Sequence, residues 1–200
     1  MKYIIIFSVI SYVIGSINPA LIISKKLYGT DLRTQGSGNA GATNALRVHG
    51  KKVGAAVLAF DFFKAFSIVL IAKCFVTFGN APYVSVLFSG FFVQLGHSFP
   101  VFFGFKGGKG VASAAGAATA LFPLAALILI SIFAVIVLIS KKVSLGSLIT
   151  AGVYPLIVSL FSSENRYFNF IFAASCAALI IIRHLPNIVR ILDGNEKNII

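Results

Sequence analysis

Thirty consecutive residues, from Val111 to Ser140, carry no charged side chain, and this run restricts the possible fold more than any other feature. As one helix the run would be about 45 Å long, whereas the hydrocarbon core of a membrane is about 30 Å thick. Pro123 divides it into an Ala- and Gly-rich first half and a bulkier second half. Of the 200 residues, 58% are hydrophobic and only 11% are charged, against roughly 25% charged in a soluble domain. The chain is therefore predicted to be an integral membrane protein.

Five further apolar segments are predicted membrane-spanning helices, because each has close to the roughly 20 residues that a crossing needs. They are Tyr3–Ser24, Val53–Val76, a segment that ends near His97, Leu145–Phe161 and Tyr167–Ile182. Within the first segment, Asn18-Pro19 is predicted to end or kink the helix. The two cysteines lie in apolar stretches, which excludes a disulfide framework and leaves no cysteine spacing typical of a metal site.

The distribution of basic residues indicates how many times the chain crosses the membrane. If the chain reverses at Pro123, seven spans place 13 of the 17 Lys and Arg residues on one side, 2 on the other and 2 within a span. A single crossing there would move Lys141, Lys142 and the basic C-terminal tail to the opposite side. The segment Val111–Phe122 is too short to span alone, and its small residues suit close packing inside a bundle.

We therefore predict an all-α fold, a polytopic membrane helix bundle of about seven transmembrane helices. Its N-terminus is expected outside and its C-terminus inside, because the more basic side of a membrane protein faces the cytosol. Residues 1–200 are expected to form a single integral membrane domain. The formal net charge of +12 then reflects topology and does not indicate a nucleic-acid partner.

A first glycine-rich stretch, Gly36–Arg47, lies on the predicted inner side. Its three glycines within six residues permit positive φ, so that successive backbone N–H groups can converge on an anion. Ser37, Thr43 and Asn44 add side-chain donors, and the guanidinium of Arg47 suits a phosphate. A flexible connecting loop built from ordinary turn residues is the alternative interpretation.

A second glycine-rich stretch, Gly96–Gly110, carries Lys106 and Lys109 between glycines and has the composition of a second phosphate cradle. It does not match the phosphate-binding loop of ATPases. Phe103 stands where that loop requires glycine, and Gly110 stands where it requires the serine or threonine that binds magnesium. The sequence therefore gives no support for ATP hydrolysis.

A third polar region, Arg183–Glu196, begins where the last predicted span ends. Arg183, His184, Asn187 and Arg190 are spaced so that several of them can share one face of a helix. The arginines are equally typical of anchors at the inner face of a membrane.

Together, the three stretches resemble the signature motifs of the acyl-phosphate:glycerol-3-phosphate acyltransferase (PlsY) family of bacterial membrane enzymes. The resemblance rests on Gly36–Arg47, His97–Ala112 and Arg183–Glu196, and it extends to Asp61-x-x-Lys64 and Val143–Ser147. It implies transfer of a fatty acyl group from acyl phosphate to the 1-hydroxyl of glycerol 3-phosphate, which gives lysophosphatidic acid and phosphate in the first step of bacterial phospholipid synthesis. It also implies a monomer in the bacterial cytoplasmic (inner) membrane, with its active site at the cytosolic face and with neither a metal ion nor a cofactor.

The resemblance also assigns roles to individual residues. The residues implied in catalysis are Ser37, Arg47, Lys109, Ser144, His184 and Asn187. Those implied in binding substrate and phosphate are Gly36, Ser37, Gly38, Asn39, Thr43, Asn44, Arg47, Lys106, Gly107, Gly108 and Lys109. No histidine is followed five positions later by aspartate, so a His-x₄-Asp dyad is absent from the sequence. We therefore expect direct transfer, with a phosphate oxygen of the acyl donor accepting the hydroxyl proton.

Two interpretations stay open for the charged residues of the second span. Asp61 and Lys64 either form a buried ion pair or take part in function, and His97 is either structural or part of the site.

Other functions are also compatible with some of the sequence. A transporter of a phosphorylated solute would place its site near the membrane midplane, a lipid-binding protein would not need the glycine-rich clusters, and a CDP-alcohol phosphotransferase would need several aspartates around metal ions.

Overall fold

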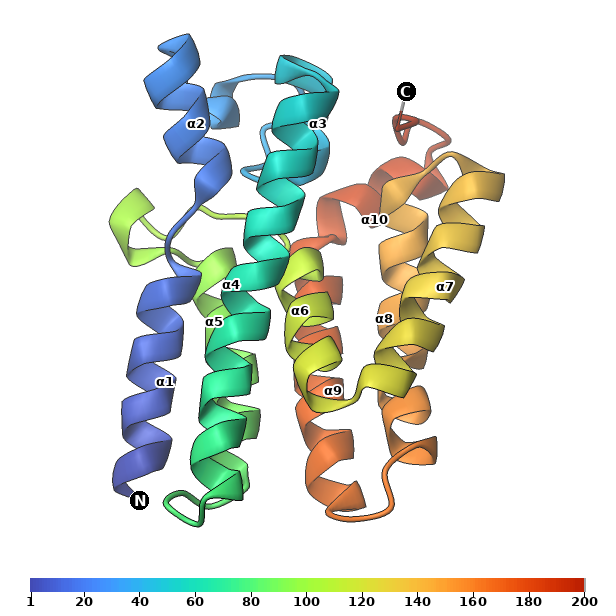
Figure 1. Ribbon diagram of the computed structural model, residues 1–200. Coiled ribbons are helices and arrows are strands. Elements are labelled where there is room, and N and C mark those ends of the chain that lie inside the picture. Colours follow the sequence, from blue (N-terminus) through green and yellow to red (C-terminus); the bar gives the residue numbers. More distant parts are fainter. Residues whose placement is uncertain (200) are drawn as a thin grey trace.

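Helices account for all the regular structure in residues 1–199, the part of the chain that the computed structural model describes (Figure 1). In chain order they are α1 (Lys2–Gly15), α2 (Pro19–Tyr28), η1 (Leu32–Thr34), α3 (Ala42–His49), α4 (Lys51–Thr77), α5 (Val84–Ser98), η2 (Val101–Phe103), α6 (Val111–Leu121), α7 (Pro123–Ser140), α8 (Val143–Leu160), α9 (Arg166–Arg183) and α10 (Leu185–Leu192). Within residues 1–199, six segments are long and apolar enough to cross a membrane, with α1 and α2 counted as one segment. The all-helical prediction is confirmed, whereas seven crossings and their orientation stay predictions.

The first predicted span is broken into two helices, as Asn18-Pro19 indicated. Asn18 caps α2, because its Oδ1 accepts a hydrogen bond of 3.0 Å from the backbone N–H of Leu21. Pro19 occupies the first turn of α2, where its missing N–H costs nothing. The span predicted over Tyr3–Ser24 is therefore one helix that ends at Gly15 and a second that continues to Tyr28.

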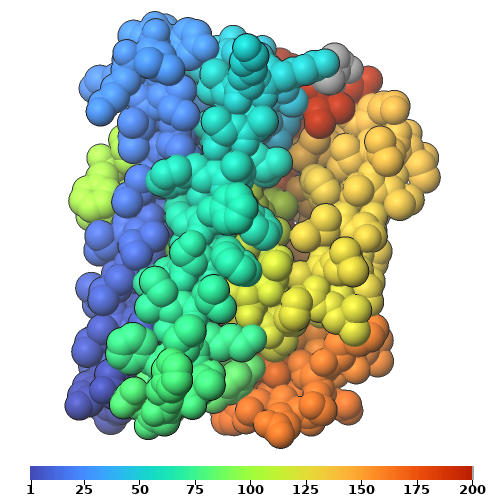
Figure 2. All heavy atoms as spheres, viewed as in Figure 1, coloured from blue at the N-terminus to red at the C-terminus, as the bar shows by residue number. Residues whose placement is uncertain are grey.

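The chain also reverses at Pro123, as predicted. Leu121 ends α6, Pro123 begins α7, and in Figure 1 the two helices run in opposite directions, with their turn short of the lower ends of α4 and α9. The small residues of α6 allow it to pack closely on α4, since a Cβ at Gly116 would overlap with the backbone carbonyl of Phe62. By contrast, α7 lies along one side of the bundle with most of its apolar surface exposed (Figure 2).

The polar stretches lie toward one end of the bundle. Figure 1 shows α2, α3, α10 and the segment that follows α10 at the end opposite to the N-terminus. The first glycine-rich stretch is anchored there by apolar contacts, because Leu32, Ala40 and Ala45 are buried together with Leu21 and Val57. These contacts anchor the stretch to the bundle, and its binding of an anion stays a prediction.

Candidate active site

Asn44 determines the conformation of the first glycine-rich stretch. Its buried amide accepts a hydrogen bond of 2.8 Å from the backbone N–H of Ser37 and donates to the carbonyl oxygens of Leu32, at 3.1 Å, and Gln35, at 3.0 Å. A Cβ at Gly36 would overlap with Asn44 Oδ1, so only glycine fits there. Asn44 thus holds the loop in place with both the oxygen and the nitrogen of its side-chain amide. The sequence predicted a direct contact between Asn44 and phosphate and did not predict this structural role.

The other predicted residues of this stretch lie on or beside the loop. Gly36 and Gly38 have φ values of 62° and 72°, which confirms the predicted positive φ at two of the three glycines, whereas the third, Gly41, is extended with φ of −149°. The side chain of Ser37 is exposed, and Thr43 lies half-buried in the first turn of α3. Asn39 lines a polar cavity that is described below.

The second glycine-rich stretch is held against the ends of α5 and α9. The N–H groups of Gly107 and Gly108 donate to the carbonyls of Ser98 and His97, at 3.3 Å and 3.1 Å. In turn, the guanidinium of Arg183 donates to the carbonyls of Gly107 and Gly108, at 3.1 Å and 3.2 Å. A Cβ at either glycine would overlap with His97, so the loop backbone approaches α5 as closely as glycine permits.

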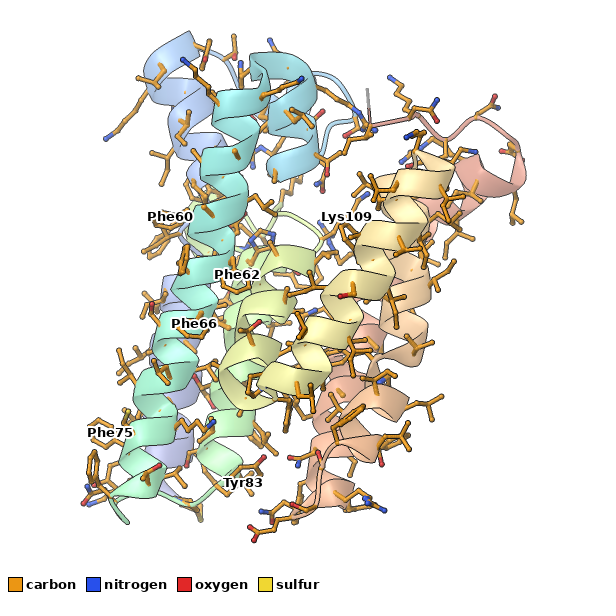
Figure 3. All side chains as sticks on the ribbon, turned by 45° about the vertical axis from the view of Figure 1, so that its right-hand side comes forward. Phe60, Phe62, Phe66, Phe75, Tyr83 and Lys109 are labelled. Atoms are coloured by element: carbon orange, nitrogen blue, oxygen red, sulfur yellow. The ribbon has the colours of Figure 1, made fainter. Side chains whose placement is uncertain are left out.

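Three residues predicted to be catalytic meet through this loop, although α8, α10 and the loop are far apart in sequence. Lys109 Nζ donates to Asn187 Oδ1 at 2.6 Å, and Asn187 Nδ2 donates to Ser144 Oγ at 2.7 Å. Ser144 and Asn187 are buried, and Lys109 is half-buried. Figure 3 shows Lys109 just before α6, toward the end of the bundle that carries α10. The short helix α10 positions Asn187, and Pro186 in its first turn sets α10 apart from α9.

Glu196 completes this cluster and is absent from the predicted site residues. Its Oε1 accepts hydrogen bonds from Ser144 Oγ, at 2.5 Å, and from Asn187 Nδ2, at 2.7 Å, while its Oε2 accepts from Arg190 Nε at 2.8 Å. Burial alone would raise the pKa of this carboxyl, but the three donors hold it below its ordinary value, so Glu196 is ionised at neutral pH. Glu196 is one of only two acidic residues in the basic tail, the other being Asp193, and this scarcity was the signal that could have identified it.

Arg47 reaches the same region from α3. Its Nη2 donates to the backbone carbonyls of Lys197, at 3.2 Å, and Asn198, at 3.0 Å, in the C-terminal segment that also carries Glu196. Its Nε is buried and has no hydrogen-bond partner within residues 1–199. Arg47 therefore keeps a free donor at this end of the bundle.

The cluster carries an excess of positive charge. Burial and the positive charges of Arg190, Arg47 and Arg183, opposed by the negative charge of Glu196, together lower the pKa of Lys109 to about 8. Four cationic side chains thus act on one another around a single carboxylate. Such a region favours a bound anion, because an anion relieves the repulsion among the cations.

His184 lies at the junction of α9 and α10 and is neutral. Its Nδ1–H donates to the carbonyl of Ile180 at 2.8 Å. Burial, followed by the nearby charges of Lys109 and Arg183, lowers its pKa to about 4. At neutral pH its Nε2 is therefore a hydrogen-bond acceptor and a weak base.

Four of the predicted binding residues line a cavity beside the second loop. Gly38, Asn39, Lys106 and Gly107 line a cavity of about 820 Å³ together with Asp31, Arg33, Thr34, Phe103, Gly104, Phe105 and Arg183. Lys106 is exposed there and makes no hydrogen bond within residues 1–199 to the partners of Lys109. Of the predicted phosphate-binding set, Gly38, Asn39, Lys106 and Gly107 thus line this cavity, Arg47 and Lys109 belong to the other cluster, and Gly36, Ser37, Thr43 and Asn44 belong to the first loop and the start of α3.

The chain is similar to known proteins over nearly its whole length. A family profile described as glycerol-3-phosphate acyltransferase matches residues 5–194. A glycerol-3-phosphate acyltransferase of Clostridioides difficile is 37% identical over 199 residues, which cover 98% of this chain and 95% of that protein. One of Desulfotalea psychrophila is 42% identical over 193 residues, which cover 96% of each chain.

Two crystal structures of PlsY (YgiH), described as an integral membrane glycerol 3-phosphate acyltransferase, have the same fold. The glycerol 3-phosphate form is 39% identical with a TM-score of 0.89, and the lysophosphatidic acid form is 38% identical with a TM-score of 0.86. Each comparison covers 98% of this chain and 94% of the other. The chain therefore belongs to the glycerol-3-phosphate acyltransferase family.

Proposed function

We propose that this acyltransferase transfers a fatty acyl group from acyl phosphate to the 1-hydroxyl of glycerol 3-phosphate, releasing lysophosphatidic acid and phosphate. The observation that carries the proposal is the cluster of Lys109, Arg47, Arg183 and Arg190 around the single carboxylate of Glu196. The relatives solved with glycerol 3-phosphate and with lysophosphatidic acid support the acceptor and the product.

Both proposed substrates are phosphorylated, and their charges repel one another. At an effective dielectric constant of 20, two unit charges 4 Å apart interact by about 4 kcal/mol. The excess of cations around Lys109 offsets this repulsion, so the two phosphates can approach within reaction distance. Positioning of this kind supplies roughly 7–11 kcal/mol of barrier reduction in well-oriented reactions.

The proposed reaction is one direct displacement. The 1-hydroxyl oxygen of glycerol 3-phosphate bonds to the carbonyl carbon of acyl phosphate, the bond from that carbon to the phosphate oxygen breaks, and phosphate leaves with the electron pair. The hydroxyl proton passes to an oxygen of that phosphate. Lys109 is suited to stabilise the negative charge on the departing phosphate.

The states of the nearby side chains support a substrate oxygen as the proton acceptor. Glu196 already accepts three hydrogen bonds, and its pKa lies below the ordinary range. His184 has a pKa of about 4 and is therefore a weak base. Neither side chain is a good proton acceptor at neutral pH, which supports a phosphate oxygen of the donor in that role.

The proposed topology has seven crossings, with α6 and α7 as two of them and the active site at the cytosolic face of the bacterial inner membrane. The excess of basic residues near the proposed site supports this orientation. The exposed Leu185, Val189 and Leu192 of α10 support a helix that lies in the membrane interface. We further propose that residues 1–200 act as one domain and as a monomer.

The proposed activity is tested with purified protein, palmitoyl phosphate and labelled glycerol 3-phosphate, without nucleotide, added metal or acyl-CoA. We expect labelled lysophosphatidic acid and one phosphate per acyl group transferred. In a parallel reaction, palmitoyl-CoA replaces palmitoyl phosphate and no product is expected. Product with the CoA ester alone, or none with the acyl phosphate, would contradict the proposal.

A further inference from the structure

Three ionisable side chains that are not part of the cluster around Lys109 form a second, buried cluster. Asp61 and Lys64 of α4 and His97 of α5 are 1%, 8% and 3% exposed. Asp61 Oδ1 lies 2.7 Å from Lys64 Nζ and 3.1 Å from His97 Nδ1. The open question about Asp61 and Lys64 is answered in part, because the ion pair is present. A buried ion pair is often no more stabilising than apolar residues of the same volume, so its presence calls for another explanation.

Lys64 links this cluster to the first glycine-rich stretch. Its Nζ donates to the carbonyls of Gly15, at 3.0 Å, and Ile17, at 2.7 Å, at the break between α1 and α2. The next residue, Asn18, donates through Nδ2 to the carbonyl of Ala40 at 3.1 Å. Lys64 therefore fixes the backbone from which Asn18 holds the first loop.

His97 links the cluster to the second glycine-rich stretch. Its carbonyl accepts the N–H of Gly108, and a Cβ at Gly108 would overlap with His97 Nε2. The same Cβ would lie only 3.1 Å from the carbonyl oxygen of Ala40, so the two loops meet at this point. Lys109 is the next residue along the chain.

We propose that Asp61, Lys64 and His97 are positioning residues that set the two glycine-rich loops relative to each other. Asp61 orients both partners, Lys64 holds the α1–α2 break behind the first loop, and His97 holds Gly108 in the second. The cluster thereby determines where Lys109 stands relative to the first loop. This inference rests on the proposed function, because its consequence is measured as acyl transfer.

The first test removes the ion pair without leaving one charge unpaired. An Asp61→Leu/Lys64→Met double variant replaces both ions with apolar side chains, a change that is often neutral for stability. We expect kcat/KM for glycerol 3-phosphate to fall on the order of 100-fold, the effect of a displacement of about 1 Å, while Tm stays close to that of the wild type.

Lys73→Met is the matched control. Lys73 also belongs to α4 and donates to a helix-end carbonyl, that of Ala120 at 3.0 Å, but it lies away from both loops. We expect this variant to keep the wild-type kcat/KM. Equal kcat/KM values for the double variant and Lys73→Met would overturn the positioning role.

A second test leaves Asp61 and Lys64 unchanged, and it applies if the double variant does not fold. Gly108→Ala introduces the Cβ that meets the His97 ring, and His97→Ala removes that ring. We expect Gly108→Ala to reduce kcat/KM much less in the His97→Ala background than in the wild-type background. Additive effects of the two changes would overturn the proposed contact.

Failure of the inference is distinguishable from failure of the proposed function. If the wild type forms no lysophosphatidic acid, the proposed function fails. The inference is then tested by the increase in Tm that glycerol 3-phosphate causes when it binds. We expect this stabilisation to be lost in the double variant and kept in Lys73→Met. Equal stabilisation of both variants would overturn the inference without any turnover being measured.

Discussion

Replacing Lys109 with methionine is expected to lower kcat/KM by a factor of about 10²–10³, the effect of removing one preorganised donor from developing negative charge. Lys109 Nζ lies 2.6 Å from Asn187 Oδ1, amid an excess of positive charge. Methionine keeps an unbranched side chain only one atom shorter and removes the charge, so the bundle should stay folded. Initial rates at varied concentrations of each substrate give the measurement.

Lys52→Met is the control for this substitution, because Lys52 is an exposed lysine in the first turn of α4, directly after α3. It makes the same change in net charge and should keep kcat/KM near the wild-type value. An equal loss in both variants would show that only the general positive charge of this end matters, and the specific role of Lys109 would be wrong.

The pH dependence follows from the same residue. Since burial lowers the pKa of Lys109 to about 8, the free enzyme loses this positive charge as the pH rises through 8. An anionic substrate is bound by the protonated form, so kcat/KM should fall about tenfold per pH unit above that value. A Lys109→Arg variant, which stays charged, should not show this fall. A wild-type profile that stays level to pH 10 would contradict the role of Lys109.

Replacing Arg47 with alanine is the second change expected to have a large effect, a loss of kcat/KM of about 10²-fold or more. Arg47 approaches the C-terminal segment through Nη2, and its buried Nε has no partner within the part of the chain described, residues 1–199. That geometry leaves the Nε donor of the guanidinium unused, and we expect a phosphate to engage Arg47 in the complex. Alanine removes both the charge and the planar donors.

Arg47→Lys separates charge from geometry. Lysine keeps the charge but lacks the planar pair of donors, so its kcat/KM should lie between those of the wild type and Arg47→Ala. The change in KM for acyl phosphate, compared with that for glycerol 3-phosphate, identifies the phosphate that Arg47 contacts. Wild-type kinetics in Arg47→Ala would remove Arg47 from the proposed site.

Local signals in the sequence were sufficient for much of the fold. Pro123 and Asn18-Pro19 mark real helix ends, because proline lacks the N–H that a helix interior needs and asparagine caps the following helix. The positive φ of Gly36 and Gly38 was likewise predictable, since glycine has no Cβ to hinder that conformation.

The arrangement of the site was less predictable, because it depends on contacts between distant segments. Glu196 reaches Ser144 only because the chain after α10 folds back toward α8, and no local spacing encodes that return. Lys106 and Lys109 are three residues apart, yet Lys106 lines the polar cavity whereas Lys109 donates to Asn187. Composition suggested a donor role for Asn44, whereas the backbone around it uses both atoms of its amide.

The central claim is that the site acts by holding two anionic substrates together, without a nucleophile of its own. It is tested most directly with purified protein and palmitoyl phosphate labelled in its acyl chain, in the absence of glycerol 3-phosphate. Direct displacement predicts no label on the protein and no burst of phosphate, followed by labelled lysophosphatidic acid once the acceptor is added. A burst equal to the enzyme concentration, with the label on Ser37 or Ser144, would contradict it.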